Sequence, residues 1–173
     1  MKNPAEKFAA LRDSAHPQAQ FLWAIFRDIF HYAAIQLEHV ADNAREGRLT
    51  FTTDLAEAVA GAEAVFLAVG TPTRRGDGHA VLSYVYAVAE EVGASLSNDA
   101  VVVTKSTVPV GTGDEVERIL TAAAPKHRFA VASNPEFLRE GAAIGDFMRP
   151  DRIVIGVEEG EAGARALAVL KRL

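Results

Sequence analysis

The sequence predicts an α/β fold, with a mostly parallel sheet flanked by helices. Two observations indicate this fold class: apolar runs of strand length recur from residue 47 onward, and helical segments separate them. Strands that alternate with helices in this way are typical of βαβ units, whose strands lie parallel. Residues 1–46 follow a different pattern, with a helical period from about Pro17 to Arg45 and a shorter stretch before it that could form another helix. We therefore expect a helical segment at 1–46 and an α/β domain at 47–173.

The helical pattern of the first part is clearest between Pro17 and Arg45. Apolar residues recur there at spacings of three and four, which marks one wide apolar helix face. These residues are Leu22, Phe26, Ile29, Phe30, Ala33, Leu37 and Val40. Proline suits a first helical turn, and Gly47 suits the residue that follows a helix. Charged residues interrupt 21–40, so we do not expect this helix to cross a membrane.

After Gly47 the pattern changes to apolar runs of strand length, beginning with RLTFTTD and continuing with AVFLAVG and AVVVTKS. Uninterrupted runs of this length are consistent with buried strands, and the longer segments between them have helical periodicity. The predicted strands cover 48–54, 64–70, 100–106, 128–133 and 152–157. The predicted helices cover 55–62, 81–96, 113–124 and 161–173.

The composition is that of a soluble globular protein, with 173 residues, 49% of them apolar and 24% charged. A net charge of −5 and the lack of a basic stripe argue against a nucleic-acid partner. Cysteine is absent, which excludes disulfides, thiolate metal sites and a thiol nucleophile. The five histidines lack metal-ligand spacing, so no metal site is expected. We expect a cytoplasmic protein.

Polar and turn-forming residues follow three of the predicted strands, at 70–73, 106–109 and 134–136. Because the carboxyl ends of parallel strands meet at one edge of the sheet, hydroxyl, amide and carboxylate groups should converge there. Ligands of open α/β sheets bind in the crevice beyond these ends. The three loops together therefore predict a ligand site.

The segment PVGTGDEV, at 109–116, has two interpretations. It follows a strand and opens a helix, where a dinucleotide-binding glycine fingerprint would lie. However, Val116 stands where the third glycine belongs, and Asp114 and Glu115 place negative charge in the first helical turn. Acidic residues there suit the helix dipole and oppose a bound phosphate. We interpret the segment as a tight turn followed by a capped helix.

Two carboxylates, Glu136 and Glu140, lie in SNPEFLREG, directly after the apolar run at 129–132. Carboxylates placed in this way can act as a general base and its helper. They can equally be ordinary solvated loop residues. The residues alone leave both interpretations open.

Three segments, VGTPT (69–73), KSTVPVGT (105–112) and NPEFLREG (134–141), closely resemble the UDP-glucose/GDP-mannose dehydrogenase family. The resemblance covers about residues 45–173. It implies a partial Rossmann-like sheet and an NAD-dependent oxidoreductase, which converts the C6 alcohol of UDP-glucose or a related nucleotide sugar to a carboxylate.

The resemblance also implies roles for individual residues. Thr107 and Glu136 would be catalytic and would handle the proton or water. NAD would be bound by Val69, Thr71, Pro72, Thr73, Ser106, Thr107, Val108 and Glu140. The nucleotide sugar would be bound by Glu136, Phe137, Leu138, Arg139 and Glu140, largely through the backbone.

The sequence departs from the family pattern at both ends. The family opens with a strand and a GxGxxG turn that grips the NAD pyrophosphate, and its later half supplies a catalytic lysine and cysteine. In place of the first βαβ unit, residues 16–45 resemble a helical segment of bacterial 3-hydroxyacyl-CoA dehydrogenase multifunctional proteins. We expect a truncated or chimeric dehydrogenase that is inactive as an isolated chain. The alternative is a non-enzymatic recombined α/β module whose main property is folding and self-association.

The expected loss of the first strand has a consequence for the sheet. In the doubly wound order 3-2-1-4-5-6 that strand is central. Its loss would separate 48–54 from 64–70 and would leave AVFLAVG with an apolar edge, which proteins normally pair or cover. We therefore predict a homo-oligomer that pairs across this edge or exchanges elements by domain swapping.

Overall fold

The computed structural model describes residues 40–74, 76, 78–139 and 142–172, which form two compact units. The larger is an α/β unit made of Asp54–Phe137 and Pro150–Leu173. The smaller takes in the described residues before Asp54 together with Leu138–Arg149. Residues 40–45 are helical, and the rest of the predicted helical segment, 1–39, lies outside the described residues.

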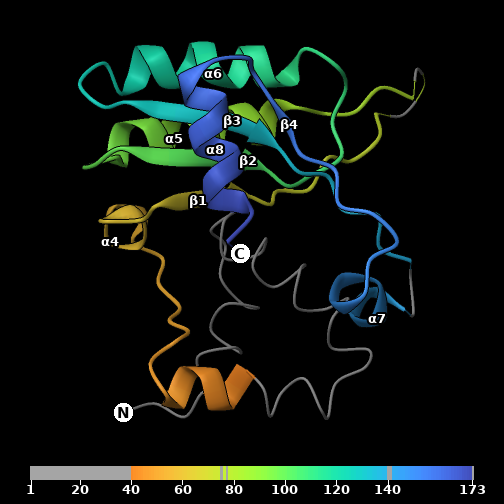
Figure 1. Ribbon diagram of the computed structural model, residues 1–173. Helices are drawn as coiled ribbons and strands as arrows, with labels where there is room; N and C mark the ends of the chain where they lie inside the picture. Colours follow the sequence, from red (N-terminus) through yellow and green to blue (C-terminus); the bar gives the residue numbers. More distant parts are fainter. Residues whose placement is uncertain (1–39, 75, 77, 140–141, 173) are drawn as a thin grey trace. The chain divides into compact units, whose positions relative to one another are not determined.

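A four-stranded, mostly parallel sheet forms the centre of the α/β unit, which confirms the predicted fold class (Figure 1). Strands β1 (Ala64–Leu67), β2 (Ala100–Thr104) and β3 (Phe129–Ser133) are parallel neighbours in that order. Strand β4 (Gly156–Val157) pairs with β3 in the antiparallel direction. β1 and β4 therefore lie at the two ends of the sheet.

Helices cover both faces of this sheet. Helix α5 (Ser83–Ser95) links β1 to β2, helix α6 (Thr112–Ala123) links β2 to β3, and the two pack against each other (Figure 1). Helix α8 (Glu161–Leu170) packs against β2 and β3 on the opposite face. The short helix α4 (Leu55–Val59) precedes β1, and α7 (Ala143–Met148) belongs to the smaller unit.

The core follows the alternation of side chains along the strands. Beneath α8, a cluster of buried residues is formed by Val101, Val103, Ala130, Ala132 and Ala166. Val102 points to the opposite face, since successive strand side chains alternate, and it is also fully buried. β2 is thus buried on both faces, which accounts for its uninterrupted apolar sequence.

The strand predicted at 48–54 is wrong, because these residues form no strand. A strand needs a neighbour that takes up its backbone hydrogen bonds, and in the described part of the chain the sheet has no strand beyond β1. Asp54 instead caps α4, where its side chain accepts a hydrogen bond of 3.0 Å from the backbone N–H of Glu57.

Two further elements differ from the prediction. The strand predicted at 152–157 shortens to Gly156–Val157. Before it, the carbonyl of Val154 accepts a hydrogen bond of 2.8 Å from the side-chain amide of Asn134, instead of a bond within the sheet. Helix α7 was not predicted, since its six residues are too few for helical periodicity to be recognised.

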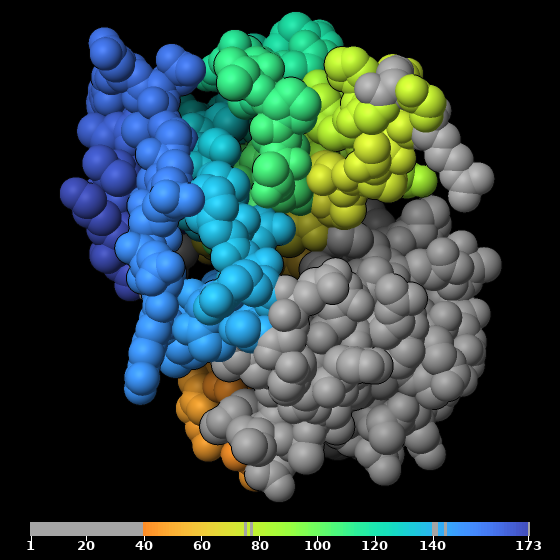
Figure 2. All heavy atoms as spheres, turned by 90° about the vertical axis from the view of Figure 1, so that its right-hand side faces the viewer, coloured from red at the N-terminus to blue at the C-terminus, as the bar shows by residue number. Residues whose placement is uncertain are grey.

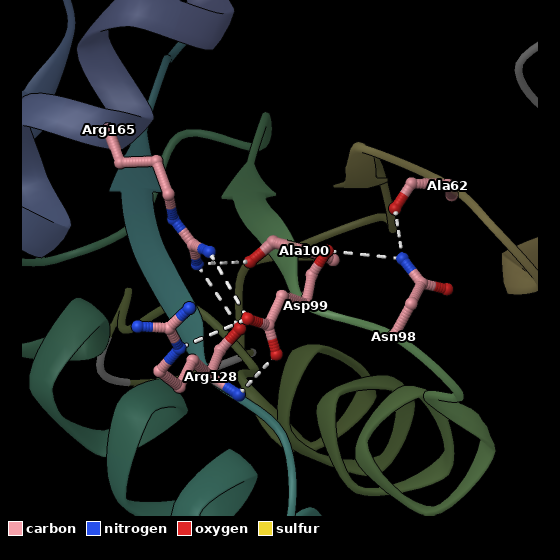
Figure 3. A network of polar contacts seen from close by, with 6 residues as sticks. All are labelled: Ala62, Asn98, Asp99, Ala100, Arg128 and Arg165. Atoms are coloured by element: carbon pink, nitrogen blue, oxygen red, sulfur yellow. Dashed lines mark hydrogen bonds and ion pairs between the residues drawn. The ribbon is translucent and has the colours of Figure 1, made fainter.

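A polar network ties the amino ends of β2 and β3 to α8 (Figure 3). The Asp99 carboxylate accepts hydrogen bonds from the backbone N–H of Arg128 at 2.8 Å and from its Nε at 3.1 Å. The Arg165 guanidinium of α8 donates to the carbonyls of Ala100 and Arg128, each at 3.2 Å. Beside it, Asn98 donates to the carbonyl of Ala62 at 3.0 Å, which adds the start of β1.

Gly163→Ala should destabilise the α/β unit. A Cβ on this buried glycine of α8 would lie 1.8 Å from the carbonyl oxygen of Glu158, so the helix would have to move. Overpacking costs about 1–3 kcal/mol, whereas alanine gains at most about 1 kcal/mol over glycine in a helix. Thermal unfolding followed by circular dichroism should show a lower Tm. Gly113→Ala is the matched control, because a Cβ on this glycine of α6 meets nothing within 4 Å. An unchanged Tm for Gly163→Ala would contradict the packing.

Asp99→Asn should lower the stability of the fold at neutral pH. It should also make that stability less dependent on pH in the acid range. Hydrogen bonds from the Arg128 backbone N–H, and then from its guanidinium, hold the pKa of Asp99 below its ordinary value. Such a carboxyl stabilises the fold above its unfolded pKa of about 3.9, and this contribution is lost as pH falls through the lower folded pKa. The Tm difference from wild type should therefore shrink below about pH 4. Asp151→Asn, at an exposed carboxylate outside the network, serves as control. A Tm difference that stays constant over the whole pH range would count against this role.

Candidate functional site

The carboxyl ends of β1, β2 and β3 meet at one edge of the sheet, as the sequence predicts (Figure 1). Backbone hydrogen bonds continue one residue beyond the strands. The N–H of Lys105 donates to the carbonyl of Leu67 at 3.0 Å, and the N–H of Asn134 donates to the carbonyl of Thr104 at 2.9 Å. The three predicted site loops therefore start side by side.

Side chains join the first two loops. The hydroxyl of Ser106, which is buried, donates to the carbonyl of Val69 at 2.5 Å. The hydroxyl of Thr71 donates to the carbonyl of Thr107 at 3.3 Å. Four of the predicted NAD-binding residues thus lie together, although the Ser106 hydroxyl proton is already used within the protein.

The remaining predicted residues of these loops lie close by in the chain. Pro72 and Thr73 are exposed and open a short hairpin-like loop, in which Thr73 bridges to Ala80 and the N–H of Val81 donates to the Pro72 carbonyl at 2.9 Å. In the second loop Thr107 is exposed and Val108 is half-buried. Thr73 and Thr107 are thus exposed hydroxyl-bearing residues in the two joined loops.

The turn that follows Val108 agrees with the tight-turn interpretation. Gly111 has a φ of 87°, in the left-handed region that favours glycine, and the Thr112 hydroxyl donates to the Pro109 carbonyl at 2.7 Å. The capped helix expected after this turn is not found, because the N-cap residue of α6 is Gly111 and no side chain caps the helix. Asp114 and Glu115 occupy the first turn, as expected.

The third loop is tied to the second by a lysine. The ammonium of Lys105 lies 3.0 Å from Oδ1 of Asn134 in a partly buried contact. Lys105 is not among the residues that the sequence singles out as functional. The signal for it is a charged residue placed directly after the buried run at 100–104.

Glu136 follows two residues later and is half-buried. Its Oε2 and the hydroxyl of Thr104 are enclosed without a hydrogen-bond partner in the described structure. Buried polar atoms are normally bonded, so an enclosed carboxylate oxygen without a partner has its acceptor capacity left for another group. A carboxylate in this state can accept a proton from a hydroxyl placed next to it.

The predicted sugar-binding residues beyond Glu136 divide between the two units. Phe137 belongs to the α/β unit, where the guanidinium of Arg152 lies 5.0 Å from its ring centroid. Leu138 and Arg139 belong to the smaller unit, and both are exposed. Glu140 lies outside the described residues.

The Arg139 side chain has a partner within its own unit. Its guanidinium pairs with both oxygens of the Asp146 carboxylate, at 2.6 and 3.0 Å, and its backbone N–H donates to the same carboxylate at 2.9 Å. The guanidinium hydrogen bonds, followed by the backbone one, lower the pKa of Asp146 to about 2. The Arg139 guanidinium is therefore held by Asp146.

The described residues offer neither a metal site nor a membrane-spanning helix. No three histidine or carboxylate side chains in these ranges gather in a way that could hold a metal ion. No helix among them is both long and apolar enough to cross a membrane.

Sequence comparison gives the family of the chain. A model of the NAD-binding domain of the UDP-glucose/GDP-mannose dehydrogenase family matches residues 27–173. This match begins within 16–45, where the sequence also shows its other resemblance, which stays a prediction. UDP-glucose 6-dehydrogenase of Rhizobium meliloti (strain 1021) is 65% identical over 130 residues, 75% of this chain and 30% of that protein. The Pseudomonas aeruginosa enzyme of that name is 56% identical over 126 residues, 70% of this chain and 28% of that protein.

Solved structures agree with the sequence comparison. A UDP-glucose dehydrogenase from Pyrobaculum islandicum matches 97% of this chain and 35% of its own, with a TM-score of 0.71 and 39% identity. A GDP-mannose dehydrogenase from Pseudomonas aeruginosa matches 76% of this chain and 31% of its own, with a TM-score of 0.69 and 33% identity. The chain spans about 30% of the length of the curated relatives that it matches. It belongs to the UDP-glucose/GDP-mannose dehydrogenase family and carries sequence of that family's NAD-binding domain.

Proposed function

We propose that this chain is the cofactor-binding part of an NAD-dependent UDP-glucose 6-dehydrogenase, an oxidoreductase that acts on the C6 alcohol of a nucleotide sugar. The names of its relatives favour UDP-glucose as the sugar. One observation carries the proposal. The half-buried carboxylate of Glu136, with an Oε2 that no described protein group bonds, lies two residues beyond the contact between Lys105 and Asn134. Thr107 lies in the neighbouring loop, which follows β2.

NAD would lie along the loops after β1 and β2. The residues proposed to bind it are Val69, Thr71, Pro72, Thr73, Ser106, Thr107, Val108 and Glu140. Within this set, the buried Ser106 holds the two loops together through its bond to Val69. The exposed hydroxyls of Thr73 and Thr107 are the ones available to a ligand.

Oxidation of an alcohol to an aldehyde removes a hydride from carbon and a proton from oxygen, and NAD, when bound, supplies the hydride acceptor. Glu136 would take the proton, because a general base must have a free acceptor within hydrogen-bond reach of the hydroxyl. Thr107 would orient that hydroxyl or a water. The step from aldehyde to acid needs a nucleophile such as a thiolate. The chain has no cysteine, so we propose that it is inactive when isolated.

The sugar would be bound by Glu136 and the segment after it, Phe137 to Glu140. Since Asp146 holds the Arg139 guanidinium, Arg139 would contribute mainly through its backbone. Phe137 is 51% exposed, so its ring has a face available to a ligand beside its contact with Arg152.

Calorimetric titration of the folded chain should give saturable heat with NAD and with UDP-glucose. Glu136→Gln keeps the size of the side chain but removes its charge, and it should weaken UDP-glucose binding roughly tenfold or more, the value of a hydrogen bond to a charged group. Glu159→Gln, at an exposed carboxylate elsewhere on the α/β unit, is the matched control and should bind normally. Flat traces from folded protein would contradict binding. Formation of the sugar acid from the two ligands, followed by chromatography, would contradict the proposed inactivity, since that product needs both oxidation steps.

We also propose that the chain self-associates along the outer edge of β1. The carbonyls of Glu63 and Leu67 accept hydrogen bonds from β2 and the residue after it, so by alternation the backbone groups of Ala64 and Phe66 point away from β2. Phe66 is 41% exposed. A groove of about 340 Å³ runs beside it and is lined by Glu63, Ala64, Phe66, Val169 and Arg172. Natural proteins rarely leave such an apolar edge without a partner.

Sedimentation velocity should detect an oligomer whose population grows with concentration. Phe66→Lys should shift it to monomer, because an edge lysine would place a charge in the paired strand. Tyr84→Lys replaces another exposed aromatic residue, on α5, and should leave the distribution unchanged. A monomeric wild type at every concentration, or equal effects of the two variants, would argue against this edge.

A further inference from the structure

We infer that Lys105 is a positioning residue for Glu136, and this inference rests on the proposed function. Lys105 follows β2 directly, and its backbone N–H is bound to the Leu67 carbonyl at the end of β1. The base of its side chain is therefore fixed to two strands. From there its ammonium reaches the third loop and contacts Oδ1 of Asn134 at 3.0 Å.

Hydrogen bonds hold the backbone and the side-chain amide of Asn134 in one orientation. Its backbone N–H donates to Thr104 at 2.9 Å, and its side-chain Nδ2 donates to the Val154 carbonyl at 2.8 Å. A flipped amide would turn its NH₂ group toward the ammonium and its oxygen toward the Val154 carbonyl, which removes both bonds. Lys105 therefore selects the amide orientation that also binds the segment before β4.

The constraint on Asn134 passes to Glu136 through a single residue. That residue is Pro135, whose ring fixes φ near −65° and leaves little freedom between the two positions. Oε2 of the Glu136 carboxylate has no hydrogen-bond partner among the described residues. Its location consequently depends on the backbone of the loop, and the last polar side-chain anchor of that backbone before Glu136 is Asn134.

The choice of lysine has a physical reason. A hydrogen bond donated by an ammonium to an amide oxygen is charge-assisted and stronger than a bond between two neutral groups. Among the described residues no carboxylate lies within ion-pair distance of Lys105, so the ammonium is directed to Asn134 and is not shared with an acid. A neutral side chain of the same length would keep the packing and lose the anchor.

The experiment compares Lys105→Met, which keeps the aliphatic length, with Lys105→Arg, which keeps a donor. Hydrogen exchange of the ligand-free chain is measured at the backbone amide of Asn134, which donates to the Thr104 carbonyl. Lys105→Met should speed its exchange by about tenfold or more, because the loop opens without its charge-assisted bond, while the core amide of Val102 keeps the wild-type rate. Lys105→Arg should restore slow exchange. Lys126→Met, at an exposed lysine after α6, is the matched control and should match wild type.

A ligand measurement separates positioning from a structural role. Lys105→Met should lower UDP-glucose affinity about tenfold, Lys105→Arg should recover it, and the double variant with Glu136→Gln should bind no more weakly than Glu136→Gln alone, since both act through one group. If wild type does not bind UDP-glucose, the proposed function fails. The hydrogen-exchange rates then still test, independently of any ligand, whether Lys105 anchors the loop at Asn134. Wild-type exchange at Asn134 in Lys105→Met, or additive losses of affinity, would overturn the inference. Should Lys105→Met not fold, Lys105→Leu carries the same comparison, since leucine also has no hydrogen-bond donor.

Discussion

The parallel pairing of β1, β2 and β3 is the constraint on which the rest of the structure depends. Each strand is only four or five residues long, yet β2 is buried along its whole length, and its backbone groups find partners on both sides. The ladder continues past the strands through the N–H groups of Lys105 and Asn134. Because an unpaired backbone group is costly in a buried sheet, these two residues have little freedom. The three motif loops inherit their relative positions from this ladder.

The two edges of the sheet use polar residues in different ways. At the amino edge, the charges of Asp99, Arg128 and Arg165 are satisfied by one another and by backbone carbonyls, so the network joins strands and helix (Figure 3). Exposed ion pairs contribute little individually, and the defined geometry is what they add. At the carboxyl edge the hydrogen bonds within the protein are incomplete. Ser106 and Asn134 are satisfied, whereas Glu136 keeps an oxygen without a partner. The Thr104 hydroxyl at the end of β2 also lacks a partner, so Glu136 is the one carboxylate among the unbonded buried polar groups of the described residues. Figure 2 views the α/β unit from the side of this carboxyl edge, where the segments that follow β1 (yellow-green) and β2 (green) lie next to each other at the surface.

Most of the α/β unit follows from local patterns. Apolar runs located β1, β2 and β3, and periodicity located α5, α6 and α8, because buried strands and amphipathic helices are both determined by which side chains must leave water. The predictions failed where pairing and not composition decides. Residues 48–54 have strand-like composition but no neighbour, and 152–155 lose their ladder bonds because Val154 binds a side chain. Helix α7 is too short to leave a periodic signal.

The sequence by itself determined the family, the NAD-binding class of the domain and the three loops that converge. It did so because motif residues are local and parallel connectivity has few arrangements. Only the tertiary structure decided which of those residues form hydrogen bonds to other groups of the protein. Ser106 binds Val69 across 37 positions, and Lys105 binds Asn134 across 29. Such contacts depend on the distance between strand ends and on the direction of each side chain. A local sequence pattern specifies neither quantity. The distinction between residues that hold the loops and the carboxylate that they leave free therefore appears only in three dimensions.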